Sequence, residues 1–272
     1  MPGAARFALT TFAMVLATCA SADRARLEVS ADTSLQAHQD EVTLNSGGST
    51  VIRVKGWQHF MLMKFEVPAE VAGWRVDAAR LYLHLAGPRH MLWRVGVSTI
   101  SADWEEGTGR GERTAEGCTF LWARSPEAPW AGPGSDFTDV AFGCGGSFMR
   151  YATPRDLPDG WVEVDVDPLL VAAVLRGGSF GLCVSDEKGQ TFWNNDFHSR
   201  EQSQFRPYLV VEGGRATARP PAITNLRAEP FPAAADFDHG AARLTFTAPQ
   251  PWAVSYALRA RGPEGVVSVP RW

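Results

Sequence analysis

Three carboxylates in the segment 161–167 have the spacing that acid–base chemistry uses. Glu163, Asp165 and Asp167 alternate with valines, so a strand here places all three on one face. Alternate residues lie about 6.5–7 Å apart along a strand, within the separation of paired carboxylates in glycoside hydrolases. The same alternation is typical of any solvent-facing strand, and Asp167 also suits the N-cap of a helix. We interpret the three as structural, which predicts a non-catalytic protein; a polysaccharide-cleaving enzyme is the alternative.

The stretch from Trp193 to Glu201 is the richest in polar and aromatic side chains. An indole face beside amide and charged groups suits stacking on a sugar ring, with contacts to its hydroxyls or carboxylates. We therefore predict ligand binding by Trp193, Asn194 and His198. Ordinary loop packing is the alternative for all three.

A second candidate surface lies on the segment 79–85, where Arg80, Tyr82 and His84 share an outward strand face. Arg94 on the next predicted strand could join them. A cationic, aromatic sheet face would hold an anionic polysaccharide through charge-assisted hydrogen bonds. The alternative is a solvated outer face that a long loop partly covers.

Metal and cofactor signals are thin. The sequence contains no G-x-S-x-G, H-E-x-x-H or P-loop motif. Its six histidines have no spacing for a transition-metal site, and no cofactor is predicted. Asp32 or Asp165 could supply oxygen ligands to a structural calcium ion, although the sequence gives no complete ligand set.

The elements that must position these residues are strands. Period-two alternation predicts half-buried strands over 59–67, 79–85, 91–97 and 161–167, with Trp93 facing the core in the third. Further strands are expected near 25–30, 33–38, 50–54, 137–142, 180–185 and 208–212. Strands at this density, separated by Gly, Pro, Asn and Asp turns, predict an all-β fold, an antiparallel two-sheet sandwich.

One short helix stands out among the strands. Asp167 is a good N-cap, Pro168 suits the first helical position, and Gly177-Gly178 supplies a left-handed stop after Arg176. A single short helix does not change the fold class.

Composition and charge exclude several classes of protein. The 272 residues carry 26 Lys and Arg against 30 Asp and Glu, a formal net charge of −4. Because the charges nearly balance, the chain has no excess of Lys and Arg to contact phosphates, so nucleic acid is not expected as a partner. Hydrophobic residues make up 45% of the chain, which excludes wholesale disorder. Ten tryptophans must be buried in a core or presented as contact surfaces.

Residues 1–22 have the features of a secretory signal peptide. The mostly apolar stretch from Phe7 to Ala17 is too short to span a bilayer, and Ala20-Ser21-Ala22 fits a small-x-small cleavage pattern. Lipoprotein processing at Cys19 is the alternative. No second apolar run has membrane length, so we predict a secreted or cell-surface protein.

Export permits disulfides, and three cysteines follow the signal peptide. Cys118 and Cys144 bracket a turn-rich insertion, so a bridge between them would staple a long loop. Cys183 lies in an apolar run and is expected to pack as a small hydrophobic residue. Three reduced thiols are the alternative.

Several blocks of the chain, taken in order, resemble those of the DNRLRE domain. They are Met63-Lys64-Phe65-Glu66-Val67, Ala79-Arg80-Leu81-Tyr82-Leu83, the segment containing Trp104, Gly160-Trp161-Val162-Glu163-Val164-Asp165-Val166, and Ser199-Arg200-Glu201 followed by Arg206-Pro207-Tyr208-Leu209-Val210-Val211. Their order and spacing match across roughly residues 27–212. The resemblance implies a jelly-roll β-sandwich of secreted and surface proteins of bacteria and archaea, some of which bind alginate-type polysaccharide. It also assigns Arg200 and Glu201 to the signature of the family, where an internal ion pair is the simpler role. The insertion between Cys118 and Cys144 departs from the pattern.

The remainder of the chain resembles the opening of a fibronectin type III domain. Ile223 to Ala228, Leu244 to Pro249 and Tyr256 to Arg259 are similar to its first three strands. The expected organisation is therefore a signal peptide, 1–22; a DNRLRE-like domain, 23–212; a linker, 213–222; and a truncated fibronectin-like segment, 223–272. We predict a carbohydrate-binding or surface-adhesion module beside neighbouring domains of a longer chain, with polysaccharide as partner. A purely structural spacer is the second hypothesis.

Overall fold

The computed structural model describes residues 22–90, 92–131, 133–141, 148–186, 192–215, 224–231, 241–247, 258–262 and 265–269. The predicted signal peptide, apart from Ala22, lies outside these residues. Cys144 and residues 216–222 of the predicted linker also lie outside them.

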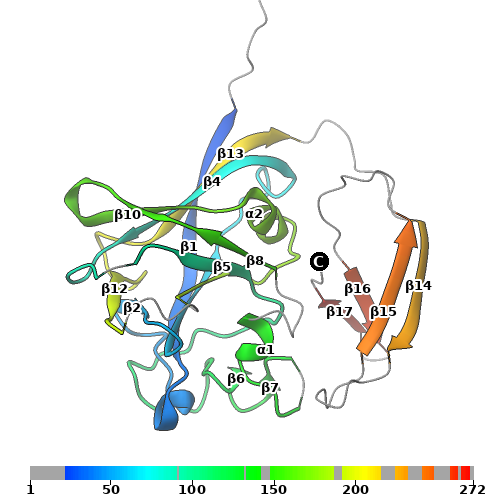
Figure 1. Ribbon diagram of the computed structural model, residues 1–272, viewed down its shortest axis with the longest axis horizontal. Helices are drawn as coiled ribbons and strands as arrows, with labels where there is room; N and C mark the ends of the chain where they lie inside the picture. Colours follow the sequence, from blue (N-terminus) through cyan, green and yellow to red (C-terminus); the bar gives the residue numbers. More distant parts are fainter. Residues whose placement is uncertain are drawn as a thin grey trace, which may run out of the picture.

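Nine antiparallel strands form two sheets that share the long strand β1 (Asp23–Gln36). Figure 1 shows β1 in blue, running through the middle of this part of the molecule. β1 pairs with the first sheet up to Glu28 and with the second from Val29, and a register shift follows between Val29 and Ala31. The first sheet continues with β13 (Tyr208–Arg215), β4 (Trp74–His84), β10 (Trp161–Asp165) and β9 (Pro154–Asp156). The second continues with β3 (His59–Phe65), β11 (Leu182–Ser185), β5 (Val95–Thr99) and β8 (Met149–Ala152). The predicted all-β, antiparallel fold is confirmed.

Smaller elements complete the described residues. The two-stranded pairs are β2 (Val51–Val54) with β12 (Asn195–His198), β6 (Trp122–Arg124) with β7 (Ala128–Pro129), β14 (Thr224–Phe231) with β15 (Ala241–Thr247), and β16 (Leu258–Gly262) with β17 (Gly265–Val269). The helical segments are η1 (Gln39–Thr43), α1 (Thr138–Ala141), η2 (Pro158–Gly160) and α2 (Pro168–Leu175). No helix of the described residues is both long and apolar enough to cross a membrane.

The inner core lies between the two sheets, because alternate residues of their strands are apolar. Leu81 on β4 and Val164 on β10 come from the first sheet, and Met61 on β3 and Val184 on β11 come from the second. Each is almost completely buried. Burying an aliphatic side chain of this size contributes about 1.5–3 kcal/mol, so the alternation seen in the sequence is what holds the sandwich together.

A separate outer core covers the other face of the second sheet. The long irregular segment after β5 places Trp104, Trp130 and Phe137 against Phe60 and Leu62 of β3. The Trp104 and Trp130 indoles donate to the carbonyls of Phe180 and Thr119 respectively. The segment that follows β5 therefore packs on the second sheet as a separate layer.

The two described cysteines lie in the outer core. Cys183 is buried, as predicted for a small hydrophobic residue. Cys118 has no exposed surface and no disulfide partner among the described residues; its predicted partner Cys144 lies outside them. Cys118 packs among the apolar side chains of the outer core, and burial raises the pKa of its thiol.

Helix α2 is placed as predicted. Asp167 is its N-cap, and the Asp167 Oδ1 accepts a hydrogen bond of 2.8 Å from the backbone N–H of Leu169. Pro168 occupies the first turn, and Gly177 follows the helix with a φ of 66°. The helix ends because this left-handed conformation suits glycine and cannot continue the turn.

Two predicted strands differ from the structure. Strand β5 begins at Val95, and Trp93 is 69% exposed while Leu92 is buried in its place. Both residues are apolar, so the alternation did not decide which of them faces the core. Residues 138–141 of the predicted strand 137–142 form helix α1, because the Asp136 side chain accepts from the N–H of Thr138 and starts a helical turn.

Strand β13 extends past residue 212, the end of the first domain that is expected from the sequence. Strand β13 continues to Arg215, and Gly213 and Gly214 pair with Val76 and Arg75 of β4 beyond a register shift at Glu212. Further along the chain, β14 and β15 pair as antiparallel strands, and so do β16 and β17.

Candidate functional site

Aromatic side chains form a row on the outer face of the first sheet, turned away from the inner core. The rings of Tyr82 on β4 and Tyr208 on β13 stack with centroids 4.7 Å apart. Trp161 on β10 meets Tyr208 edge-on at 5.4 Å, and His84 lies 5.1 Å from Trp161. Residues directly opposite on neighbouring strands share a face, which is why three separate segments build one row.

The row continues beyond the sheet. Phe205 stacks on His84 with centroids 3.9 Å apart and also stacks on His198 of β12 at 5.4 Å. At the other end the Arg26 guanidinium lies 3.7 Å above the ring of Tyr208. We call the six rings the aromatic strip: Tyr82, His84, Trp161, His198, Phe205 and Tyr208. All six are half-buried, so each offers part of its ring to a ligand.

The structure brings three predicted site residues, Tyr82, His84 and His198, into the strip. Their partners Trp161, Phe205 and Tyr208 were missed as site residues. The outward position of Trp161 was visible in the alternation of its strand. Its nearness to Tyr208, however, depends on strand pairing across the sheet.

Charges beside the strip are balanced, in contrast to the predicted cationic face. The Arg80 Nη1 lies 2.7 Å from a carboxylate oxygen of Glu212, and its Nε lies 3.5 Å from Asp165. Arg155 pairs with Glu163 in the same way. Because each guanidinium faces carboxylates, the strip offers stacking surfaces and hydrogen bonds rather than an excess of positive charge.

Two groups of the strip are held in their neutral forms. Burial, followed by a hydrogen bond to Glu163, raises the pKa of Tyr82 to about 12. Its hydroxyl therefore stays protonated and can donate. Burial and then the nearby His84 lower the pKa of His198. A neutral imidazole stacks on Phe205 without carrying charge into the row.

The three alternating carboxylates each have structural partners. Glu163 is buried and pairs with Arg155, and Asp165 is exposed and pairs with Arg80. Asp167 caps α2 and lies 3.4 Å from Arg150. Each carboxylate of the run therefore takes part in a structural contact.

Replacing Asp167 with alanine is expected to lower the free energy of unfolding by about 1 kcal/mol, because α2 loses its N-cap. Asp165→Ala, two residues away on the exposed face, is the matched control and should change it by less than about 0.5 kcal/mol. Urea denaturation measures both. Equal losses in the two variants would contradict the capping role.

The remaining predicted site residues lie elsewhere. Trp193 is exposed and stacks on His90 with centroids 5.1 Å apart. Arg94 is exposed and lies over the ring of Tyr151 at 4.3 Å, beside the second sheet. It cannot join Arg80, because the strand that follows it, β5, belongs to the other sheet.

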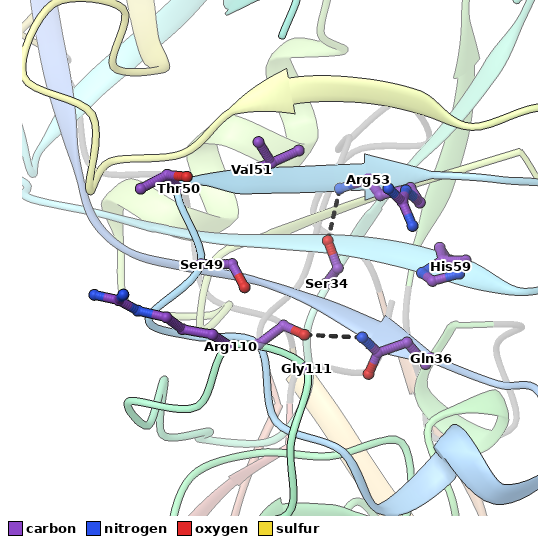
Figure 2. A pocket seen from close by; sticks show the side chains of 10 residues that line it. Ser34, Gln36, Ser49, Thr50, Val51, Arg53, His59, Arg110 and Gly111 are labelled. Atoms are coloured by element: carbon purple, nitrogen blue, oxygen red, sulfur yellow. Dashed lines mark hydrogen bonds between the residues drawn. The ribbon is translucent and has the colours of Figure 1, made fainter. Parts of the chain in front are cut away.

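A polar cavity of about 360 Å³ opens between the second sheet and strand β2 (Figure 2). Ser34 and Gln36 on β1 and His59 on β3 lie on the face that β2 covers, and Arg53 of β2 donates its backbone N–H to the Ser34 hydroxyl. Arg110 lines the same cavity from the segment 100–121 between β5 and β6, which we call the long loop. We call this space the polar pocket.

An adjoining cavity of about 460 Å³ shares Gln36, Arg53 and His59 with the polar pocket and adds Lys55 and the predicted site residue Asn194. Such volumes are in the range that binds small ligands. The strip ends beside this region, since His198 lies opposite Val51 in the β2–β12 pair and Val51 lines the pocket.

Two buried polar atoms that line the polar pocket have no hydrogen-bond partner among the described residues. Gln36 and His59 are each 8% exposed, and the Gln36 Oε1 and His59 Nδ1 have no hydrogen-bond partner within the described residues. The Arg53 guanidinium is held by Asp196 at 2.6 Å, whereas Lys55 and Arg110 make no ion pair with any described residue. The polar pocket thus combines unsatisfied polar atoms with the unpaired Arg110, and the adjoining cavity adds Lys55, a combination that suits a hydroxylated, acidic ligand.

Comparison with known proteins gives no match for this chain, either among family models or among curated proteins.

Proposed function

We propose that this chain is a non-catalytic, exported module that binds polysaccharide, as its resemblance to the DNRLRE domain implies. The aromatic strip is the observation that carries the proposal. Sugar rings pack against aromatic side chains, and the part-exposed rings of the strip, with neighbouring centroids 3.9–5.4 Å apart, form one continuous apolar surface for an extended chain. The paired charges beside the strip supply hydrogen bonds to hydroxyls.

A preference for acidic sugars is assigned to the polar pocket. A chain that follows the strip past His198 reaches the pocket at Val51. A carboxylate on its sugar would there meet Arg110, or Lys55 in the adjoining cavity. Uronate polysaccharides such as alginate therefore become the preferred ligands, and neutral glycans the weaker ones.

Binding is tested with the full chain against a panel of neutral and uronate polysaccharides, by affinity electrophoresis and calorimetry. Trp161→Ala and Tyr208→Ala should each weaken binding at least about tenfold, because each removes part of the apolar ring surface of the strip. Tyr151→Ala, an exposed ring on the second sheet, is the matched control and should bind as the parent does. Arg110→Ala should weaken uronate binding more than neutral binding.

Retention of no glycan would contradict the proposal and favour the structural spacer. Product release from a polysaccharide, abolished by Asp165→Asn, would contradict the non-catalytic part and favour an enzyme.

A further inference from the structure

Three carboxylates from distant segments meet beside the polar pocket. They are Asp32 on β1, Glu106 in the long loop and Glu201 in the turn after β12, and one oxygen of each lies within 4.8 Å of the others. Asp32 is completely buried, and the side chains of Glu106 and Glu201 are 14% and 21% exposed. Buried carboxylates rarely lie this close together unless a positive charge neutralises them.

Arg200 compensates only part of this cluster. Its Nε donates to the Glu106 Oε1 at 2.8 Å, its Nη2 donates to Oε2, and its backbone N–H donates to the Asp32 Oδ2 at 2.8 Å. The backbone N–H of Asp32 adds a hydrogen bond of 2.6 Å to Glu106. After these contacts the Asp32 Oδ1 and the Glu201 Oε2 are still buried and without any partner among the described residues.

An unpaired buried acceptor costs about 1–3 kcal/mol, and here two of them belong to carboxylates in one cluster. Three carboxylates face one guanidinium, so the ionised cluster has an excess of two negative charges. Burial, reinforced by Glu201 and Glu106 and opposed by the Arg200 N–H, raises the pKa of Asp32. Burial, followed by Glu106, also raises the pKa of Glu201. Burial is the main cause of both shifts, and the neighbouring carboxylates add to it.

We propose that Asp32, Glu201 and Glu106 bind a calcium ion. The free oxygens of Asp32 and Glu201 are its first ligands, and water reaches the ion through the part-exposed side of Glu201. All donors are oxygens, which favours a hard cation, and Ca²⁺ accepts an irregular oxygen set more readily than Mg²⁺ does. Of the two residues considered for calcium from the sequence, Asp32 takes this role, whereas Asp165 is exposed and pairs with Arg80.

The ion would fasten three segments of the chain to one another. Strand β1, the long loop and the turn after β12 contribute one carboxylate each. The same turn is tied to the polar pocket, since the Ser199 hydroxyl donates to the carbonyl of Ser49, which lines it. Calcium would therefore stabilise the walls of the pocket, whether or not the pocket binds a sugar.

The test uses the full chain stripped with EDTA and titrated with CaCl₂ in a calorimeter, with no glycan present. One ion should bind per chain with a Kd of about 10⁻⁴–10⁻³ M, the range of extracellular modules. Calcium at about ten times Kd should raise the melting temperature by roughly 3–6 °C. No binding heat together with an unchanged melting temperature would overturn the proposal.

Variants locate the site. Asp32→Asn and Glu201→Gln should each weaken calcium binding at least about tenfold. Glu201 lies at the part-exposed side of the cluster, so Glu201→Gln can still be measured if Asp32→Asn fails to fold. Asp77→Asn, in an exposed pair with Arg75, is the matched control and should leave the titration unchanged. Undiminished binding in both cluster variants would overturn the assignment. A second outcome would also overturn it: calcium does not change the stability of the parent, and Asp32→Asn is more stable than the parent. That result would mean that a shared proton, and not a calcium ion, neutralises the carboxylates of the cluster.

Discussion

Replacing Asn45 with alanine is expected to lower the free energy of unfolding by about 3–5 kcal/mol. Asn45 is completely buried, and its Nδ2 donates to the carbonyls of Glu106 at 2.7 Å and Cys118 at 2.8 Å. Its Oδ1 accepts from the N–H of Gly109 at 2.7 Å and of Gly47 at 3.3 Å. Alanine leaves four backbone groups without these partners, and each buried, unpaired group costs about 1–3 kcal/mol.

The backbone around Asn45 cannot rearrange to satisfy the groups that the alanine variant leaves unpaired. A Cβ on Gly109 or Gly117 would lie 2.7 Å from Asn45 atoms, so both glycines approach it as closely as main chain allows. The Asn45 N–H also donates to Glu112, and its carbonyl accepts from Gly111. The side chain therefore anchors the long loop that carries Glu106 and Arg110.

Chemical denaturation at neutral pH measures this effect. Asn194→Ala, in an exposed asparagine of the same size, is the matched control and should change stability by less than about 0.5 kcal/mol. Asn45→Asp keeps the shape but turns a donor into an acceptor facing two carbonyls, so it should cost at least as much as alanine. A loss below about 1 kcal/mol in both variants would show that the loop is held elsewhere.

The strands could be predicted from sequence because their signal is local. In β10, Val162 and Val164 alternate with Glu163 and Asp165, and one face must be buried. The cap of α2 is equally local, since Asp167 and Pro168 lie next to the helix that they start. Trp93 was misplaced because its neighbour Leu92 is apolar too, and only packing against the rest of the core chose between them.

The candidate sites depend on pairing between distant segments, which leaves no local signal. Tyr82 and Tyr208 stack only because β4 and β13 pair in one register, and a shift by one residue would turn one ring inward. Asp32, Glu106 and Glu201 come together across 169 positions of the chain. The residue types in the sequence suggested ligand binding, but only the strand pairing shows which of these residues lie next to one another.

His59 gives the second large effect, which depends on pH. Burial, then the positive charges of Arg53 and Lys55, lower its pKa from 6.5 to about 4, against a smaller opposing effect of Asp196. The folded protein therefore keeps His59 neutral where the unfolded chain already binds a proton. Since the folded pKa is the lower one, stability is complete above pH 6.5 and is lost as the pH falls toward 4.

At pH 4.5 this loss should reach about 2.5 kcal/mol, because a tenfold difference in proton affinity between the folded and unfolded chains corresponds to about 1.36 kcal/mol. His59→Gln has no imidazole to protonate, so the difference in unfolding free energy between parent and variant should move by that amount in favour of the variant between pH 7.5 and 4.5. Subtracting the variant removes the other acid-sensitive groups, including Asp32, whose raised pKa acts in the opposite direction.

Urea denaturation of parent and variant at both pH values measures the difference. Ser49→Ala also alters the polar pocket but keeps the imidazole, so it should retain the pH dependence of the parent. An equal loss in the parent and in His59→Gln would mean that His59 is protonated in the folded state. In that case its Nδ1, which has no partner within the described residues, would have to find an acceptor, and the polar pocket would gain a positive charge beside Arg53 and Arg110.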